Sequence, residues 1–296
     1  MNHMTTSRKP RILLTGASSG IGLTTAEQLA AGGAEVIMVS RDPASGAAAR
    51  EKVAALATAA EPIFLAADLS NQASIRALST LLHERFDSID VLINSAGTAY
   101  RRRELTVDGI ELTFATNHLA PFRLTHLVFD LLSAAPAARI ISTTSESHSK
   151  RLDFDNLQGE RKYTFFSAYA RSKLANILFT YELARRLAGS RITANCFTPG
   201  PTSTNFGRGA GGAMGLLSAL VRLVGSGAES GARTAAYLAT SPEMDKATSL
   251  YFFHGRAGRR KPVTYGPEVA ARLWVISERL THASPEITKE VLEVMQ

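Results

Sequence analysis

The sequence predicts an α/β fold in which one parallel sheet carries helices on both of its faces. Three observations lead to this fold class. Short apolar runs alternate with alanine-rich amphipathic segments along the chain. A glycine-rich turn follows the first apolar run, where a strand would lead into a helix. No proline-rich or serine-rich linker divides the 296 residues, which favours a single domain.

The apolar runs are short enough to be buried strands, and they predict about seven: residues 11–14, 35–39, 62–66, 91–93, 139–142, 192–197 and 250–253. The segments between them have helical apolar spacing: residues 23–31, 45–60, 70–85, 110–132, 169–187 and 231–239. Each helix must cross back over the sheet to reach the next parallel strand, so the alternation predicts a doubly wound arrangement. We expect a disordered tail over residues 1–10 and the domain over residues 11–296.

The composition is that of an ordinary globular protein, with 45% hydrophobic and 20% charged residues, which excludes disordered and fibrous classes. The formal net charge is +7, but the basic residues are dispersed, which favours solvated loops over a nucleic-acid partner. The sequence shows neither a signal-peptide pattern nor an apolar run of about 18 residues, so we expect a cytoplasmic protein without a membrane anchor. Cys196 is the single cysteine and is expected to be a core thiol, and the scattered histidines predict no metal site.

The glycine-rich turn covers residues 15–22, which read Thr-Gly-Ala-Ser-Ser-Gly-Ile-Gly. Glycines allow the backbone to approach a pyrophosphate, whose charge is met by the amides at the start of the following helix. A tight strand-to-helix turn without a ligand is the alternative. The position of the turn in the first βαβ unit favours a dinucleotide site of the Rossmann type. The candidate contacts in this turn are Gly16, Ser18, Ser19, Gly20, Ile21 and Gly22.

The second predicted strand ends at Ser40, and Arg41 follows. Dinucleotide folds commonly place an acid here, which accepts a hydrogen bond from the ribose 2′-hydroxyl. A serine removes the repulsion toward a 2′-phosphate, and a neighbouring guanidinium can pair with that phosphate. The sequence therefore predicts NADP(H) as the preferred cofactor, with NAD(H) still possible. The alternative is that Arg41 pairs only with Asp42 or solvent.

Tyr169 and Lys173 lie four residues apart near the start of a predicted helix and therefore share one face. A nearby cation stabilises tyrosinate and lowers the pKa of the phenol, so Tyr169 could exchange a proton with a substrate oxygen. Ser145 follows the fifth predicted strand, at the sheet edge where open α/β folds bind ligands. Taken alone, the Tyr169 and Lys173 pair could also be an exposed helix face.

These motifs occur in an order that resembles the short-chain dehydrogenase/reductase family over essentially the whole chain from Arg11. Beside the glycine turn, the matching motifs are Asn94-Ser95-Ala96-Gly97, Asn117, Ser145, Tyr169-x3-Lys173 and Pro199-Gly200. Residues 117–122, 155–160 and 172–176 further resemble the retinol-dehydrogenase-like branch. The resemblance also implies a homodimer or homotetramer.

The resemblance implies a role for each motif residue. Tyr169 would be the general acid/base, and Lys173 would bind the nicotinamide ribose and tune Tyr169. Ser145 would orient the substrate carbonyl or hydroxyl, and Asn117 would hold a proton-relay water. The remaining implied cofactor contacts are Asp68 and Leu69 at the adenine, Asn94, Ala96 and Gly97 in support, and Pro199, Gly200 and Thr204 near the carboxamide.

Residues 206–230 are glycine-rich at both ends and hold an apolar segment that fits no strand, which predicts a lid over a substrate rather than a membrane-surface helix. The predicted function is NADP(H)-dependent interconversion of an alcohol and a ketone or aldehyde on an apolar small molecule. Two alternatives are a non-catalytic NADP(H)-sensing or scaffold protein, and an epimerase or dehydratase on the same fold.

Overall fold

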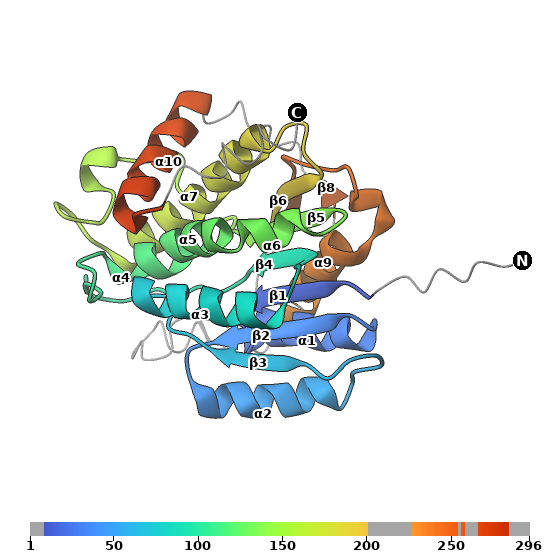
Figure 1. Ribbon diagram of the computed structural model, residues 1–296. Helices are drawn as coiled ribbons and strands as arrows, with labels where there is room; N and C mark the ends of the chain where they lie inside the picture. Colours follow the sequence, from blue (N-terminus) through green and yellow to red (C-terminus); the bar gives the residue numbers. More distant parts are fainter. Residues whose placement is uncertain (1–8, 201–226, 254–255, 258–265, 284–296) are drawn as a thin grey trace, which may run out of the picture.

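The computed structural model describes residues 9–200, 227–253, 256–257 and 266–283 (Figure 1). Thr204 and residues 206–226 of the predicted lid lie outside these ranges, and residues 227–230 form the start of a helix. The carbonyl of Pro10, the last residue of the predicted tail, accepts a hydrogen bond from the amide of Glu35. None of the helices in these ranges is both long and apolar enough to cross a bilayer.

In these described ranges, eight strands form one sheet in the order β3-β2-β1-β4-β5-β6-β7-β8. They are β1 (Arg11–Thr15), β2 (Glu35–Ser40), β3 (Ile63–Ala66), β4 (Val91–Asn94), β5 (Ala138–Thr143), β6 (Ile192–Thr198), β7 (Tyr251–Phe253) and β8 (Arg256–Ala257). The first seven are parallel, which confirms the predicted sheet. The eighth pairs antiparallel with β7, and its two residues are too few to show a periodic pattern.

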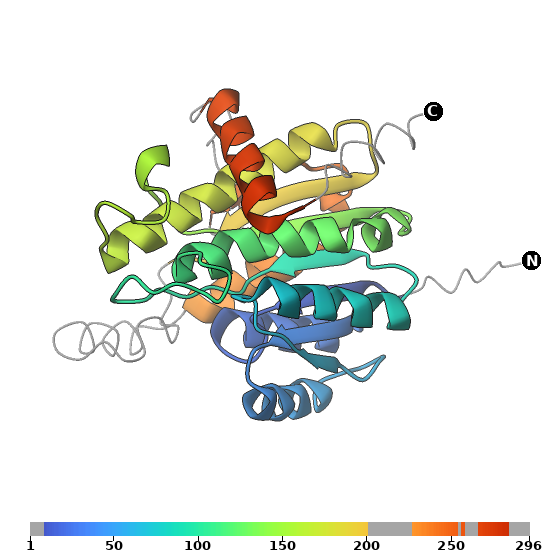
Figure 2. The same cartoon turned by 60° about the vertical axis from the view of Figure 1, so that its left-hand side comes forward.

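Helices cover both faces of the sheet (Figures 1 and 2). One face carries α1 (Gly20–Ala31), α2 (Pro43–Ala54) and α9 (Gly227–Thr240). The other carries α3 (Gln72–Arg85), α5 (Ala120–Leu127) and α7 (Phe165–Arg186), and α10 (Pro267–Thr281) packs outside α7. Short elements complete the described chain: α4 (Leu112–Phe114), η1 (Ala115–Leu119), α6 (Phe129–Ser133), η2 (Phe154–Asn156) and η3 (Pro242–Met244).

Burial on both faces explains why the strands appear as continuous apolar runs. In β1, Ile12 and Leu14 pack into the core cluster that holds α1, whereas Leu13 packs into the cluster that holds α3. Successive strand side chains point to opposite faces, so a strand covered on both sides needs an apolar residue at every position.

The helix predicted over residues 110–132 is divided into four short pieces. A single π-helical turn, η1, joins α4 to α5. Pro121 in the first turn of α5 has no amide hydrogen, so it cannot donate to the carbonyl four residues earlier, at Asn117. Val128 leaves the helical conformation (φ −116°, ψ 17°) and separates α5 from α6. Asn117 therefore lies in an irregular turn and not in a regular helix.

Other helices also differ from the predicted bounds. The helix predicted over residues 45–60 ends at Ala54. The helix predicted from Tyr169 begins four residues earlier, at Phe165, because Thr164 and Ser167 cap it reciprocally. Tyr169 is therefore in the second turn of α7, held in continuous helix on both sides.

The strand order reverses direction between β1 and β4, because the chain builds outward from β1 to β3 and then restarts on the other side with β4. Open α/β sheets bind ligands in the crevice outside the carboxyl ends of the strands at such a switch point. The glycine turn starts at the last residue of β1 and the motif 94–97 starts at the last residue of β4, so the two motifs flank this point.

Candidate active site

The glycine turn after β1 is shaped by close backbone contacts. Gly16 has a φ of +72°, and a Cβ added to it would lie 2.8 Å from the Cα of Ala96. A Cβ on Gly22 would lie 2.1 Å from the carbonyl oxygen of Gly16. The Gly16 amide donates to the carbonyl of Val39 at 2.8 Å. No larger residue fits at Gly16 or Gly22 without moving the backbone.

The N-terminus of α1 faces outward from this turn. Ser19 is the N-cap residue with extended backbone, and its side chain makes no capping hydrogen bond. The first amides of a helix have no acceptor within the helix and carry a partial positive charge. A cradle of backbone amides with glycines at its closest approaches suits a pyrophosphate, so this turn fits a dinucleotide.

Thr15 joins the glycine turn to the segment after β4. Its Oγ1 accepts hydrogen bonds from the amides of Ser95 (3.0 Å) and Ala96 (3.2 Å) and donates to the carbonyl of Ile93 (3.4 Å). Asn94 is buried, and its amide nitrogen and oxygen have no partner among the described residues. Sequence reasoning missed the linking role of Thr15, because a hydroxyl that bonds to distant backbone leaves no local pattern.

The residues expected at the adenine end follow β2 and β3. Ser40 is buried and its hydroxyl has no partner in the described part of the chain. Arg41 is exposed, and within the described ranges no carboxylate lies within 4 Å of its guanidinium. Asp42 instead caps α2 by accepting a hydrogen bond from the amide of Ser45 at 3.0 Å. Arg41 therefore forms no ion pair with Asp42, and its exposed position leaves open the alternative that it pairs only with solvent.

Asp68 and Leu69 follow β3 at the same edge. One carboxylate oxygen of Asp68 accepts from the amide (2.9 Å) and hydroxyl (2.8 Å) of Ser70. The Leu69 side chain is buried in the core cluster under α3. Asp68 therefore has one carboxylate oxygen engaged with Ser70, and the Leu69 side chain is not available to a cofactor.

Two of the four consecutive hydroxyl residues 142–145 are the last residues of β5 and two follow the strand, and their surroundings differ. Ser142 and Thr143 are buried, and Thr144 donates to the carbonyl of Phe197 at 3.0 Å. Ser145 is the one whose hydroxyl forms a hydrogen bond with Tyr169. The fold thus brings Tyr169 on α7 beside Ser145 at the end of β5.

Lys173 lies one turn beyond Tyr169, with its Nζ 5.5 Å from the centre of the Tyr169 ring. Nζ donates to the carbonyl of Thr143 at 3.2 Å. Lys173 is 4% exposed, and this burial lowers its pKa to about 8.

Burial raises the pKa of Tyr169, while the hydrogen bond from Ser145 acts in the opposite direction. The sequence-based expectation of a lowered pKa is therefore wrong for this structure. Burial removes water from around the phenolate, and this effect on the pKa exceeds that of the hydrogen bond from Ser145.

Asn117 is fully buried and bonded on both sides. Its Oδ1 accepts from the amide of Thr98 (2.7 Å), and its Nδ2 donates to the Thr98 carbonyl (2.8 Å) and to the hydroxyl of Ser172 (2.9 Å). A Cβ on Gly97 would lie 3.4 Å from Lys173 Nζ and 3.7 Å from Asn117 Oδ1. The fold therefore gathers Asn117, Lys173 and the segment after β4 around one point.

Sequence reasoning missed Ser172 and Thr98 as partners of Asn117. Ser172 stands inside the motif that resembles the retinol-dehydrogenase-like branch, directly before Lys173, so a weak signal existed. Thr98 acts through its backbone amide and carbonyl, which any residue carries, so no sequence signal could reveal it.

Pro199 and Gly200 follow β6 at the same edge, and Gly200 has a φ of +79°. A Cβ on Gly231 of α9 would lie 2.5 Å from the Cβ of Pro199 and 3.5 Å from Ile21. The start of α9 therefore packs closely on both the turn after β6 and the first turn of α1. Cys196 lies in the core of β6, where burial raises the pKa of its thiol to about 12.

The edge thus combines a backbone cradle suited to phosphate, a hydroxyl pair formed by Ser145 and Tyr169, and a buried ammonium at Lys173. Such a group can pass a proton to or from an oxygen atom placed beside Tyr169. The cradle and the hydroxyl pair lie at ends of strands in one sheet, so one extended ligand could reach both.

Sequence comparison shows which proteins share this arrangement. The profile of the family described as short chain dehydrogenase matches residues 10–212. Human retinol dehydrogenase 14 is 38% identical over 285 residues, which cover 90% of this chain and 84% of that protein. Human retinol dehydrogenase 13 is 36% identical over 276 residues, which cover 91% of this chain and 83% of that protein.

Comparison with solved structures agrees. An uncharacterized protein from Mycobacterium paratuberculosis has a TM-score of 0.75 at 32% identity, covering 93% of this chain and 94% of that one. The NADP complex of Pseudomonas aeruginosa RhlG has a TM-score of 0.67 at 25% identity, covering 85% of this chain and 97% of that one. A short chain dehydrogenase from Burkholderia cenocepacia in complex with NADP has a TM-score of 0.64 at 27% identity, covering 82% of this chain and 95% of that one. The resemblance inferred from the motifs is thereby confirmed: the chain belongs to the short-chain dehydrogenase/reductase family, in its retinol-dehydrogenase-like branch, and is an oxidoreductase.

Proposed function

We propose that the protein interconverts an alcohol and a ketone or aldehyde on an apolar small molecule, with NADP(H) as its cofactor and Tyr169 as the general acid/base. The observation that carries this proposal is the hydrogen bond between Ser145 and Tyr169, one helical turn from the buried ammonium of Lys173. Retinol dehydrogenases are among the relatives, which supports an apolar substrate.

Side chains of this protein would supply and accept the proton that is exchanged with the substrate oxygen. In the direction of reduction, the hydroxyl of Ser145 donates a hydrogen bond to the substrate carbonyl, and Tyr169 transfers its proton to that oxygen. In oxidation Tyr169 accepts the proton from the alcohol. NADP(H), when bound, supplies or takes up the hydride. Lys173 favours the phenolate form of Tyr169 during transfer, because an ammonium stabilises a nearby developing negative charge.

Different residues would hold different parts of the cofactor. The amides at the start of α1 would hold the pyrophosphate, and Arg41 would pair with a 2′-phosphate beside the unpartnered hydroxyl of Ser40. Asn94 and Lys173 would face the nicotinamide ribose. The NADP complexes of RhlG and of the Burkholderia cenocepacia protein support the phosphorylated cofactor.

The test is NADPH oxidation with a panel of apolar aldehydes and ketones, with small polar carbonyls for comparison. We expect turnover of apolar members, and we expect Tyr169→Phe to lower kcat by about 100-fold or more while NADPH still binds. Tyr237→Phe, which changes a partly buried tyrosine on α9 whose hydroxyl donates to Glu243, is the matched control and should retain full activity. Activity of Tyr169→Phe within a few-fold of the parent protein would remove Tyr169 from the proposed mechanism.

A further inference from the structure

Residues 155–160 lie in the loop between β5 and α7 and share in the resemblance to the retinol-dehydrogenase-like branch, yet the proposed mechanism gives them no task. The structure buries this loop against two elements of the site. Leu157 is 4% exposed and lies in one apolar cluster with Phe114 of α4 and Leu174 of α7. The loop therefore packs against both the helix that carries Tyr169 and the element that leads into η1.

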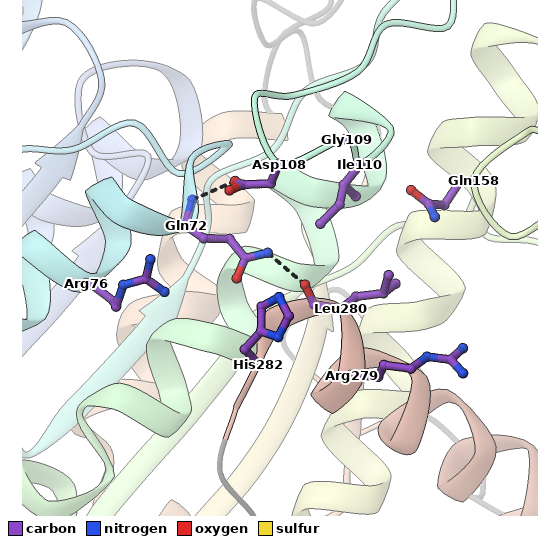
Figure 3. Close-up of a pocket in the computed structure, with 9 residues that line it drawn as sticks. All are labelled: Gln72, Arg76, Asp108, Gly109, Ile110, Gln158, Arg279, Leu280 and His282. Atoms are coloured by element: carbon purple, nitrogen blue, oxygen red, sulfur yellow. Dashed lines mark hydrogen bonds between the residues drawn. The ribbon is translucent and has the colours of Figure 1, made fainter.

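A hydrogen bond to Gln158 joins the loop to the start of α4. The Oε1 atom of Gln158 accepts from the amide of Glu111 at 3.0 Å, and Glu111 is the N-cap residue of α4. Figure 3 shows the Gln158 side chain directed toward Gly109 and Ile110, in the segment before α4, beside the cavity that these residues line. Because α4 continues into η1, the loop is tied to the turn that holds Asn117.

Arg171 joins the same loop to α7. Its Nη1 donates to the carbonyl of Asn156 at 2.7 Å, and a Cβ on Gly159 would lie 3.4 Å from its Nη2. Arg171 is 7% exposed, and no carboxylate of the described chain lies within 4 Å of its guanidinium. Burial lowers the pKa of Arg171, while the carboxylates of Glu111 and Glu160 act in the opposite direction. A buried cation on α7 is therefore held by a carbonyl of the loop and attracted by carboxylates of the loop and of the α4 cap.

The place of Arg171 in the helix gives this contact its importance. Side chains two residues apart on an α-helix point about 200° away from each other, so Arg171 points away from both Tyr169 and Lys173. Between them, the hydroxyl of Ser172 accepts from Asn117 Nδ2 at 2.9 Å. One turn of α7 thus directs Tyr169 and Lys173 toward the site, while Arg171 attaches the opposite side of that turn to the loop.

We propose that Arg171 is a positioning residue for Tyr169. Its guanidinium holds this turn of α7 against the loop, so that the Tyr169 hydroxyl stays within hydrogen-bond reach of Ser145. Proton transfer needs that geometry, and a small displacement of the donor lowers the rate without removing a contact to the cofactor. This role rests on the proposed function of Tyr169 as general acid/base.

The test measures kcat of Arg171→Met per NADPH-binding site, counted by fluorescence titration, so that loss of folded protein does not register as loss of kcat. We expect kcat to fall about tenfold with the NADPH Kd within about twofold. Arg171→Lys should return kcat to within about threefold of the parent protein, because the observed bond uses one donor. Arg171→Gln, with a shorter polar side chain, should show the same loss and replaces Arg171→Met if that variant does not fold. An unchanged kcat in the methionine or glutamine variant would overturn the positioning role.

Arg123→Met is the matched control. Arg123, on α5, is also 7% exposed and also donates to a backbone carbonyl, that of His282, at 2.9 Å. We expect this variant to lower the free energy of unfolding about as much as Arg171→Met does, but to keep kcat within about twofold of the parent protein. A loss of kcat in Arg123→Met equal to that in Arg171→Met would show a general effect of removing a buried arginine and would refute the positioning role.

Combination with Tyr169→Phe separates this role from the proposed function. Where Tyr169→Phe alone lowers kcat by about 100-fold, adding Arg171→Met should change kcat by less than about twofold, because the hydroxyl to be positioned is gone. A further loss of about tenfold would show that Arg171 acts by another route, and would overturn its positioning role while leaving that of Tyr169 intact. Near-parent activity of Tyr169→Phe would instead refute the proposed function, and the positioning role with it.

Discussion

Lys173 is a charged residue placed where charge is costly. It is buried, its ammonium donates to the backbone carbonyl of Thr143 and lies over the Tyr169 ring, and no carboxylate of the described chain lies within 4 Å. Its pKa is lowered from 10.5 to about 8 by burial, which corresponds to about 3 kcal/mol of lost stability at neutral pH. The unfolded chain holds this proton more tightly, so the cost is complete below pH 8 and diminishes as the pH rises toward 10.5.

We therefore predict that Lys173→Met abolishes turnover without lowering the free energy of unfolding at pH 7. The variant should have a higher free energy of unfolding than the parent protein in urea at pH 7. This difference should be smaller at pH 9.5, where the parent protein loses its buried charge. Lys52→Met on α2, where the lysine is exposed, should change neither stability nor its pH dependence. A loss of more than about 2 kcal/mol in Lys173→Met at pH 7 would show that the ammonium stabilises the fold.

At the adenine end, a single cation is expected to select the cofactor. Arg41→Ala should weaken NADPH binding by about tenfold or more and leave NADH nearly unchanged, because only NADPH carries the 2′-phosphate. Ser40→Asp should reverse the preference by adding an acceptor for the 2′-hydroxyl that repels the phosphate. Fluorescence titration with both cofactors measures this, with Arg50→Ala on α2 as control. Equal weakening of NADPH and NADH in Arg41→Ala would indicate a structural arginine.

At the scale of elements, a buried carboxylate supports the turn that carries Asn117. Glu111 is 1% exposed and accepts from the amides of Thr113 and Phe114, both at 2.8 Å, which caps α4. The amide of Glu111 in turn donates to Gln158 at 3.0 Å. Because α4 runs directly into η1, this cap determines where the irregular turn begins.

We predict that Glu111→Ala lowers the free energy of unfolding by about 1–2 kcal/mol and lowers kcat about tenfold through displacement of Asn117, with the NADPH KM within about twofold. Glu111→Gln keeps one acceptor oxygen and should recover part of both losses. Glu104→Ala, an exposed neighbour, is the matched control. Lower stability with an unchanged kcat would show that the cap does not position Asn117.

At the scale of the whole molecule, buried histidines make the folded chain sensitive to acid. Burial lowers the pKa of His118 to about 3 and that of His126 to about 4. His126 packs between Phe122 and Trp274, with ring centres 4.3 and 5.3 Å away. The unfolded chain takes up these protons first, so stability is lost as the pH falls from about 6.5 through the folded pKa values.

His126→Phe keeps an aromatic ring in place but removes the imidazole that takes up a proton in the unfolded chain. Between pH 7 and pH 4.5, we expect the variant to lose about 2–3 kcal/mol less stability than the parent protein in urea unfolding. His83→Gln should act in the opposite direction, because hydrogen bonds to Ser79 and Asp130 overcome burial and raise the pKa of His83. Parallel pH profiles for the parent protein and His126→Phe would contradict the assignment of this proton.

The sequence by itself determined the alternation of strands and helices, the parallel sheet and the family. Strands covered on both faces must be apolar at every position, and a phosphate-binding turn needs glycine where a Cβ would collide. Both constraints act on residues that are neighbours in the sequence, so the sequence reveals them. Tyr169 and Lys173 could be named because their spacing places them on one helix face, whereas Ser145 was selected among four consecutive hydroxyl residues by the resemblance to the family.

Other features depend on contacts between distant parts of the chain, and only the tertiary structure decided them. Thr15 joins the ends of β1 and β4, and Thr98 holds Asn117 through backbone atoms that every residue has. The direction of the Tyr169 pKa shift was misjudged because local spacing shows the cation at Lys173 but not the loss of water around the phenol. Local patterns record periodicity and steric need, whereas burial and long-range hydrogen bonds exist only once the chain has folded.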